Sequence, residues 1–276
     1  MPCPPYVNGA EAVVRSEEEL RKALFREGAT WIRLARDIAL AEEVDLSPLM
    51  ECSGHQFLGF DSSIDDDPGA RFVLRKEFDG GALLAWRTDR FGGGGEPPYH
   101  TLHFFVQNLV FDGMGRSGNL VEFHQSDVSY MRDVTFRNSG GHGLVLGPPH
   151  RPPGNYAHPE DRALGCPGTY QTAATTLLDC RAYDCAGVGV SAIAAIDLTI
   201  VGGEARGNGT DLRLIGPSFN DGCAGKKKWF RGTGSIVDWP STSAELDLAY
   251  GVHTSGSMPV AGIATTGDCY GLDLDA

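Results

Sequence analysis

Four similar stretches recur between residues 107 and 216, and they constrain the fold more than any other feature of this sequence. Each combines alternating apolar residues with a small or acidic turn residue, and a short turn and a second apolar strand follow each copy. The copies are Asn108-Leu-Val-Phe-Asp-Gly, Asp133-Val-Thr-Phe-Arg-Asn, Asp179-Cys-Arg-Ala-Tyr-Asp and Gly202-Gly-Glu-Ala-Arg-Gly. Equivalent residues of successive copies are 25, 46 and 23 residues apart, and 46 is twice 23. This periodicity predicts a β-solenoid, in which each copy buries its apolar face against the next.

The composition supports this fold and narrows the range of partners. The 276 residues include 37 glycines, which suit the tight turns of a solenoid, and 41% hydrophobic residues, which suffice for one continuous core. The formal net charge of −13 argues against nucleic acid as a partner, because phosphate binding needs a basic surface. The same charge disfavours a polyanionic substrate unless a cation or a local basic patch intervenes.

The sequence also bears on location and on bound metals. The segment from Met1 to Tyr6 lacks a basic region followed by an apolar run, and no stretch of about 18 apolar residues occurs. Cys180 and Cys185 lie five residues apart and fit small core residues better than zinc ligands. The three aspartates that begin at Asp65 fit a solvated turn better than a calcium site. We therefore expect a cytoplasmic protein with reduced thiols, no cofactor or metal and no membrane partner.

A short amphipathic helix is expected over residues 16–28. Ser16 and Glu19 have the spacing of a capping box, and Gly28 fits the end of the helix. The apolar stripe consists of Leu20, Ala23 and Leu24. Short strands follow from Trp31 onward, and the first of them would otherwise leave an exposed sheet edge, so the helix has a capping role.

These features resemble the right-handed parallel β-helix of the pectate-lyase-like superfamily. The resemblance rests on the helix that leads into Ile32-Arg-Leu and on the repeats that begin at Asp133 and Asp179, and it covers roughly residues 13 to 250. It implies a single-domain, all-β fold. The expected parts are an N-terminal segment and capping helix (1–30), a parallel β-helix (31–250) and a C-terminal segment or cap (251–276). Lyases, hydrolases, epimerases, cyclising transferases and non-catalytic fibres share this architecture, so it does not define an activity.

Three long insertions interrupt the repeat. They run from Arg87 to His100, from Gly147 to Thr172 and from Gly216 to Gly234. Each follows the second strand of a copy, so all three are expected to leave the cylinder along one edge. Short turns follow His124 and Ala192, which predicts a groove with long loops as walls and short-turn rungs as the floor. Long loops in a compact domain are usually functional, and the alternative is a contact between copies in a homo-oligomer.

Strand alternation places candidate catalytic residues on this floor. In Leu120-Val-Glu-Phe-His, Glu122 and His124 are expected to point outward together. The neighbouring rungs place Ala85, Arg87, Val145, Ser191 and Arg213 beside them. His124 is the expected general acid or base, with Glu122 orienting it, and His142 is a second candidate.

The remaining candidates would contact the substrate or its developing charge. Arg213 and Arg87 fit an oxyanion or a carboxylate. Ser191 fits substrate binding, because no nucleophile-elbow motif surrounds it. The loops add Tyr156, His158, Lys227 and Trp229, whose aromatic members would stack on a sugar or an aromatic ring. Asp133 and Asp179 occupy turn positions, where local hydrogen bonding explains them better than catalysis.

We therefore expect a metal-independent acid/base enzyme of the lyase, isomerase or cyclase type. It would transfer a proton on a small polar or sugar-like intracellular substrate within the groove. One alternative, which the resemblance most commonly implies, is an extracellular uronate-type polysaccharide lyase or C5-epimerase. Another is a non-catalytic β-helix that binds a glycan or a protein.

Overall fold

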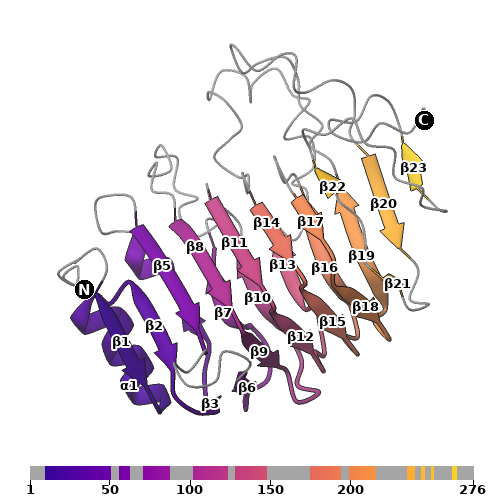
Figure 1. Ribbon diagram of the computed structural model, residues 1–276. Helices are drawn as coiled ribbons and strands as arrows, with labels where there is room; N and C mark the ends of the chain where they lie inside the picture. Colours follow the sequence, from indigo (N-terminus) through magenta and orange to yellow (C-terminus); the bar gives the residue numbers. More distant parts are fainter. Residues whose placement is uncertain are drawn as a thin grey trace, which may run out of the picture.

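Three parallel β-sheets form the body of the molecule in the computed structural model (Figure 1). The structure describes residues 10–50, 56–62, 71–87, 102–123, 128–147, 175–193 and 199–215, and the strand segments 235–239, 244–245, 250–251 and 263–265. Within these ranges the chain winds in coils, and each coil adds one strand to each sheet. The described part is mostly β, as a parallel β-helix requires.

The parallel strands are distributed as follows. Sheet A contains β1 (Glu11–Val14), β2 (Trp31–Leu34), β5 (Gln56–Asp61), β8 (Leu102–Gln107), β11 (Val128–Arg132), β14 (Thr175–Leu178) and β17 (Thr199–Val201). Sheet B contains β3 (Ile38–Leu40), β6 (Phe72–Lys76), β9 (Leu109–Asp112), β12 (Thr135–Arg137), β15 (Arg181–Tyr183) and β18 (Glu204–Arg206). Sheet C contains β4 (Val44–Asp45), β7 (Ala82–Trp86), β10 (Asn119–Phe123), β13 (Leu144–Leu146), β16 (Val188–Ile193) and β19 (Thr210–Ile215).

Reversed strands continue all three sheets at the C-terminal end. They are β20 (Ser235–Trp239), β21 (Ala244–Glu245), β22 (Tyr250–Gly251) and β23 (Ile263–Thr265). β22 pairs antiparallel with β17, β21 with β18 and β20 with β19, and β23 pairs with β20. The last parallel strand of each sheet therefore has a partner on its outer edge.

The expected helix forms at the N-terminal end, after β1 has already joined sheet A. It consists of α1 (Glu17–Lys22) and a π-helical turn, η1 (Ala23–Glu27). The Ser16 side chain accepts a hydrogen bond from Glu19 N at 3.2 Å, as in a capping box. The Glu19 carboxylate accepts from Arg15 N rather than from Ser16 N, so this box is displaced by one residue.

The helix is anchored by its apolar stripe. Leu20, Ala23 and Leu24 are buried in the same core cluster as the first strands. Gly28 ends the π-turn with φ 65°, a left-handed conformation that favours glycine. A second short helix, α2 (Ser47–Met50), follows β4. No helix in the part of the chain that the structure describes is long and apolar enough to cross a membrane.

The corner between sheets A and B explains the repeated acidic residue of the sequence motif. Asn108, Asp133 and Asp179 have φ values of 53°, 53° and 50°, and Gly202 has the same left-handed conformation in the last coil. Asn and Asp tolerate this conformation better than other side chains because they bond locally to the backbone. The expectation that Asp133 and Asp179 serve the turn agrees with this geometry.

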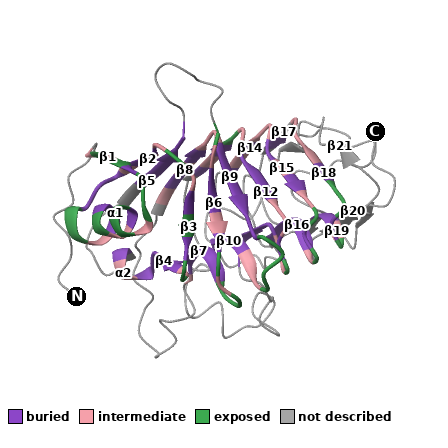
Figure 2. Ribbon diagram, turned by 90° about the horizontal axis from the view of Figure 1, so that it is seen from below, coloured by how far each residue is buried: buried purple, intermediate pink, exposed green. Residues whose placement is uncertain are grey.

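Buried residues concentrate on the strands of the three sheets (Figure 2), and their apolar side chains form one core cluster. An aromatic series runs through the N-terminal coils, with ring centroids 5.7 Å apart for Phe60 and Phe104 and 4.1 Å for Phe104 and Phe123. Phe111 and Phe136 stack almost parallel at 5.5 Å. Aromatic pairs at these separations add to the stability that burial itself provides.

Strand register settles how the second insertion interrupts the repeat. Phe136 pairs directly with Ala182, and Val145 pairs directly with Ser191. The 46-residue step is therefore one coil step that contains an insertion, and its equality with two periods is a coincidence. Glu122 and Ser191 lie two strands apart on sheet C.

Both described cysteines are buried, and their thiols should resist modification. Burial raises the pKa of Cys180 to about 12 and that of Cys185 to about 11. The thiolate is the reactive form, so neither residue should be alkylated in the native protein at pH 8, and both should react after unfolding. Peptide mass mapping after iodoacetamide treatment measures this. Rapid native labelling of either residue would contradict the burial.

Candidate functional site

The candidate site begins with a row of side-chain positions across sheet C. Glu122 pairs with Ala85 on one side and with Val145 on the other. The row continues from Val145 to Ser191 and from Ser191 to Arg213. This is the row expected from strand alternation, so the neighbours predicted from the sequence are correct. The structure describes the backbone of Arg213 but not its side chain.

The sequence predicts that this row faces solvent, but the described side chains of the row are buried. Ala85 is fully buried, Val145 and Ser191 are 1% and 3% exposed, and Glu122 is 7% exposed. A carboxylate removed from water in this way is stable only when it is paired and hydrogen-bonded. Its partners therefore define what Glu122 can do.

Arg87 binds Glu122 and a second carboxylate, Glu43. Its Nε donates to Glu122 Oε2 at 2.5 Å, and its two terminal nitrogens donate to the Glu43 oxygens at 2.6 and 2.8 Å. The second contact is the bidentate geometry that suits guanidinium and carboxylate. Burial lowers the pKa of Arg87, but the bonds and charges of Glu43 and Glu122 outweigh burial and raise it overall. Arg87 therefore remains a cation shared by two acids.

The polar contacts continue from Glu122 to His142. Asn119 Nδ2 donates to Glu122 Oε1, and Asn119 Oδ1 accepts from His142 N at 2.7 Å. The result is a series that crosses successive coils, which we call the polar chain. It consists of Glu43, Arg87, Glu122, Asn119 and His142.

The backbone of β16 fixes the tautomer of His142. Its Nδ1 accepts a hydrogen bond from Val188 N at 2.8 Å. A nitrogen that accepts cannot carry a proton, so the proton of the neutral ring lies on Nε2. In the neutral ring, Nε2 is therefore the nitrogen that can donate a hydrogen bond.

Glycines make room for these side chains at the turns that precede sheet C. A Cβ on Gly81 would collide with Glu43, one on Gly141 with Asn119 Oδ1, and one on Gly187 with the His142 ring. The glycines that start the second strand of each repeat therefore serve the polar chain as well as the turn.

A buried lysine supports the same turns from inside. Lys76 has no exposed surface, and its ammonium donates to the carbonyls of Gly80, Gly81 and Ser117, the first at 2.7 Å. Burial lowers its pKa, while the charges of Asp79, Glu43 and Glu122 act in the opposite direction. Three donors meet three acceptors, so Lys76 acts as a clamp between two coils.

Replacing Lys76 by methionine should destabilise the protein by about 2–3 kcal/mol, because three carbonyls lose charged donors. Urea unfolding measures the change. The matched control is Lys22→Met. Lys22 is 57% exposed and paired with Glu27, so its loss should change the stability little. Equal losses in the two variants would rule out a clamp.

The other expected site residues divide into two groups. Arg87, Glu122, His142 and Ser191 lie on or beside sheet C, and three of them belong to the polar chain. His124, Tyr156, His158, Lys227 and Trp229 lie outside the described residues, as do Asp65 to Asp67. Across the described ranges, no group of three or more His, Cys, Asp or Glu side chains is placed to bind a metal.

Sequence reasoning missed Glu43 and Asn119. Glu43 precedes the short strand β4, where the repeat is too irregular to recognise. Asn119 immediately follows Gly118 at the start of β10 and looks like an ordinary turn residue. Asn119 could have been found from its position in the repeat. It directly follows Gly118, just as His142 directly follows Gly141 in the next coil.

Comparisons with known proteins add no family to this description. No protein-family model matches the chain, no curated protein matches it, and no solved structure matches it. The architecture and the polar chain are therefore the basis for a functional proposal.

Proposed function

We propose that this protein is an acid/base enzyme of the lyase, isomerase or cyclase type, and that its site lies along the polar chain of sheet C. The substrate is a small polar or sugar-like molecule, and the reaction requires no metal. The observation that carries the proposal is His142, whose tautomer is fixed by Val188 N and whose backbone is held by Asn119. A hydrogen-bond donor held in this way can stabilise the charge that develops when a base removes a proton from the substrate.

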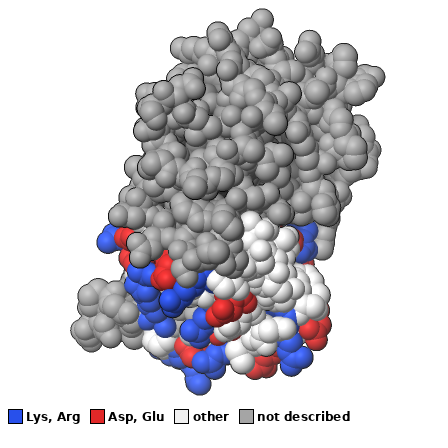
Figure 3. All heavy atoms as spheres, turned by 90° about the vertical axis from the view of Figure 1, so that its right-hand side faces the viewer, with Lys and Arg blue, Asp and Glu red and all other residues white. Residues whose placement is uncertain are grey.

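Enclosure of the charged groups supports this location. The side chains of Arg87, Glu43 and Glu122 are 17%, 18% and 9% exposed. Apart from Asp112, which is buried and paired with Arg137, the partners in most other ion pairs of the described residues are more exposed, and basic and acidic side chains lie side by side on the face shown in Figure 3. Arg75 and Asp37, for example, are 43% and 38% exposed. Removal of water strengthens electrostatic interactions, and buried charges of this kind gather at functional sites.

Each member of the site has a separate task in this proposal. His142 donates an Nε2–H hydrogen bond to the substrate oxygen that gains negative charge during elimination, isomerisation or ring closure. Arg87 engages both carboxylates, so Glu122 positions Asn119 and His142 and does not act as the base. His124 keeps the role of base that the sequence suggests. Ser191 and Arg213, on the same row, contact the substrate.

The finer features expected from the sequence belong to the same proposal. The coils wind in the right-handed sense of the pectate-lyase-like superfamily, the N-terminal helix caps them, and the three insertions wall the site along one edge. The protein acts in the cytoplasm. Most residues of the insertions lie outside the described ranges, and the direct strand pairings on either side of the second insertion are consistent with its adding no coil.

The proposed function can be tested before the substrate is identified, by measuring deuterium uptake into a mixture of candidate substrates. The protein is incubated in D₂O with a mixture of metabolites and sugar acids, and mass spectrometry compares the mixture with a protein-free control. An acid/base enzyme of this type should convert one component or label it with deuterium. If no component is converted or labelled, the protein is instead a non-catalytic β-helix.

A further inference from the structure

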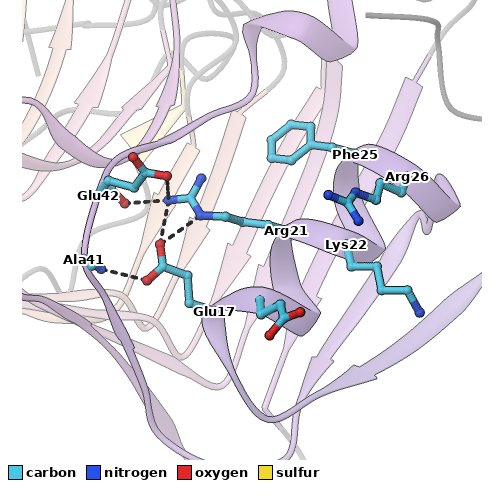
Figure 4. A pocket seen from close by; sticks show the side chains of 8 residues that line it. Glu17, Arg21, Lys22, Phe25, Arg26, Ala41 and Glu42 are labelled. Carbon is cyan, nitrogen blue, oxygen red and sulfur yellow. Dashed lines mark hydrogen bonds and ion pairs between the residues drawn. The ribbon is translucent and has the colours of Figure 1, made fainter.

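A pocket lies at the N-terminal end of the molecule (Figure 4), and none of its lining residues belongs to the polar chain. Its volume is about 580 Å³, which falls in the range of small-molecule sites. Side chains of α1 and η1 form one wall, and Ala41 and Glu42, between β3 and β4, form the other. The arrangement of its two arginines indicates what it can hold.

Arg21 lies on one side of the pocket with part of its guanidinium engaged. Nε and Nη2 contact Glu17 Oε1 at 2.8 and 2.7 Å, and Nη2 also donates to the Glu42 carbonyl at 2.9 Å. Nη1 makes no hydrogen bond or ion pair with another residue in the described ranges. Figure 4 shows this nitrogen pointing away from Glu17 and Glu42, on the side of Phe25. Arg21 is therefore held rigidly and keeps an unfilled donor.

The π-turn brings Arg26 to the same pocket. The Gly28 N–H bonds to the Ala23 carbonyl, five residues earlier, in place of the four-residue step of an α-helix. Arg26 lies within this turn and lines the pocket together with Arg21. Arg26 forms no ion pair with any described residue, whereas Lys22 is occupied by Glu27 at 2.6 Å. Two guanidinium groups with unfilled donors thus line one cavity.

Phe25 adds an apolar surface between them. Its side chain is only partly buried against the core, so part of the ring remains available to the pocket. The lining carboxylates Glu17 and Glu42 contact Arg21, while Glu18 adds a negative charge at the helix. Acidic and basic side chains both line the pocket, so its net charge does not favour an anion. A ligand would be recognised by the direction of the free N–H donors instead. Guanidinium groups have donors and no acceptor, and a carboxylate offers two acceptors.

We infer that this pocket binds a small carboxylate that carries an aromatic or branched apolar group. The carboxylate lies between Arg21 Nη1 and the Arg26 guanidinium, and the apolar group packs on the Phe25 ring. This site is separate from the proposed active site and does not depend on any catalytic activity.

Binding of three probes to the full chain tests the inference. The probes are phenylacetate, its uncharged isostere phenylacetamide, and acetate, and titration followed by NMR gives the affinities. Phenylacetate should bind about tenfold more tightly than either of the others, because only it has both the charge and the ring. Phe25→Leu should weaken phenylacetate and phenylacetamide together. Equal affinities for phenylacetate and phenylacetamide, or no binding of phenylacetate at millimolar concentrations, would overturn the site.

The variant Arg26→Gln tests whether the Arg26 guanidinium binds the carboxylate of the ligand. It should remove the preference for phenylacetate over phenylacetamide while leaving the fold intact, because Arg26 is exposed and has no described ion-pair partner. Arg36→Gln is the matched control. Arg36 is an exposed arginine outside the pocket lining, so the preference should persist there. A preference that survives Arg26→Gln would place the anion elsewhere and contradict the inference.

Discussion

Replacing Arg87 by methionine should destabilise the protein by about 3–5 kcal/mol, because two enclosed carboxylates lose the cation that they share. Glu43 and Glu122 stay in place in this variant, with side chains that are 18% and 9% exposed in the native protein. Removing one partner of a buried ion pair leaves an uncompensated charge, which is far costlier than the pair itself. Urea unfolding followed by circular dichroism measures the change.

Two further variants show whether charge is the cause. Adding Glu43→Gln and Glu122→Gln to Arg87→Met should restore at least half of the lost stability, because the amides are neutral. The matched control is Arg75→Met, which breaks the open pair with Asp37 at 2.6 Å and should cost less than about 1 kcal/mol. If the triple variant is no more stable than Arg87→Met, lost packing rather than unpaired charge explains the effect.

His142→Asn should lower the rate of the reaction found by deuterium labelling about 10²–10³-fold, the usual contribution of one hydrogen-bond donor aimed at developing charge. The asparagine oxygen can accept the Val188 N–H in place of Nδ1, so the backbone contact is kept. The proton on Nε2 is lost. The free energy of unfolding should therefore change by less than about 1 kcal/mol, which separates catalysis from folding.

An independent spectrum tests the state of the ring. ¹⁵N NMR of the wild-type protein should show His142 protonated on Nε2 and unprotonated on Nδ1 near neutral pH. A folded His142→Asn variant with the wild-type rate would remove His142 from the mechanism, even if the tautomer is as expected. A signal from protonated Nδ1 would contradict the geometry, whatever the rate.

The sequence predicted the repeat, the helix and the strand neighbours of Glu122 because each depends on a local pattern. Alternation determines which residues of β10 share a face, and the glycines before each sheet C strand align the copies. The neighbours Ala85, Val145, Ser191 and Arg213 follow from that alignment alone.

What the sequence could not supply was the environment of that face. Whether Glu122 is open or enclosed depends on groups distant in the chain, and Arg87 and Glu43 are 35 and 79 residues away from it. The period also could not distinguish an insertion from an added coil, because a 46-residue step fits both. Only strand register, which is a long-range property, resolves that choice.

The polar chain also has a consequence for how the molecule comes apart. Coils of a solenoid interact mainly with their immediate neighbours, so their unfolding can spread from an end one coil at a time. The ion pairs of Arg87 and the bonds of Asn119 and His142 tie the coils from β4 to β16 together through side chains. Asn208, which is buried in the next coil, accepts from Cys185 N at 2.9 Å and donates to the Ala182 carbonyl at 3.0 Å. The coils from β4 to β19 should therefore open as one cooperative block.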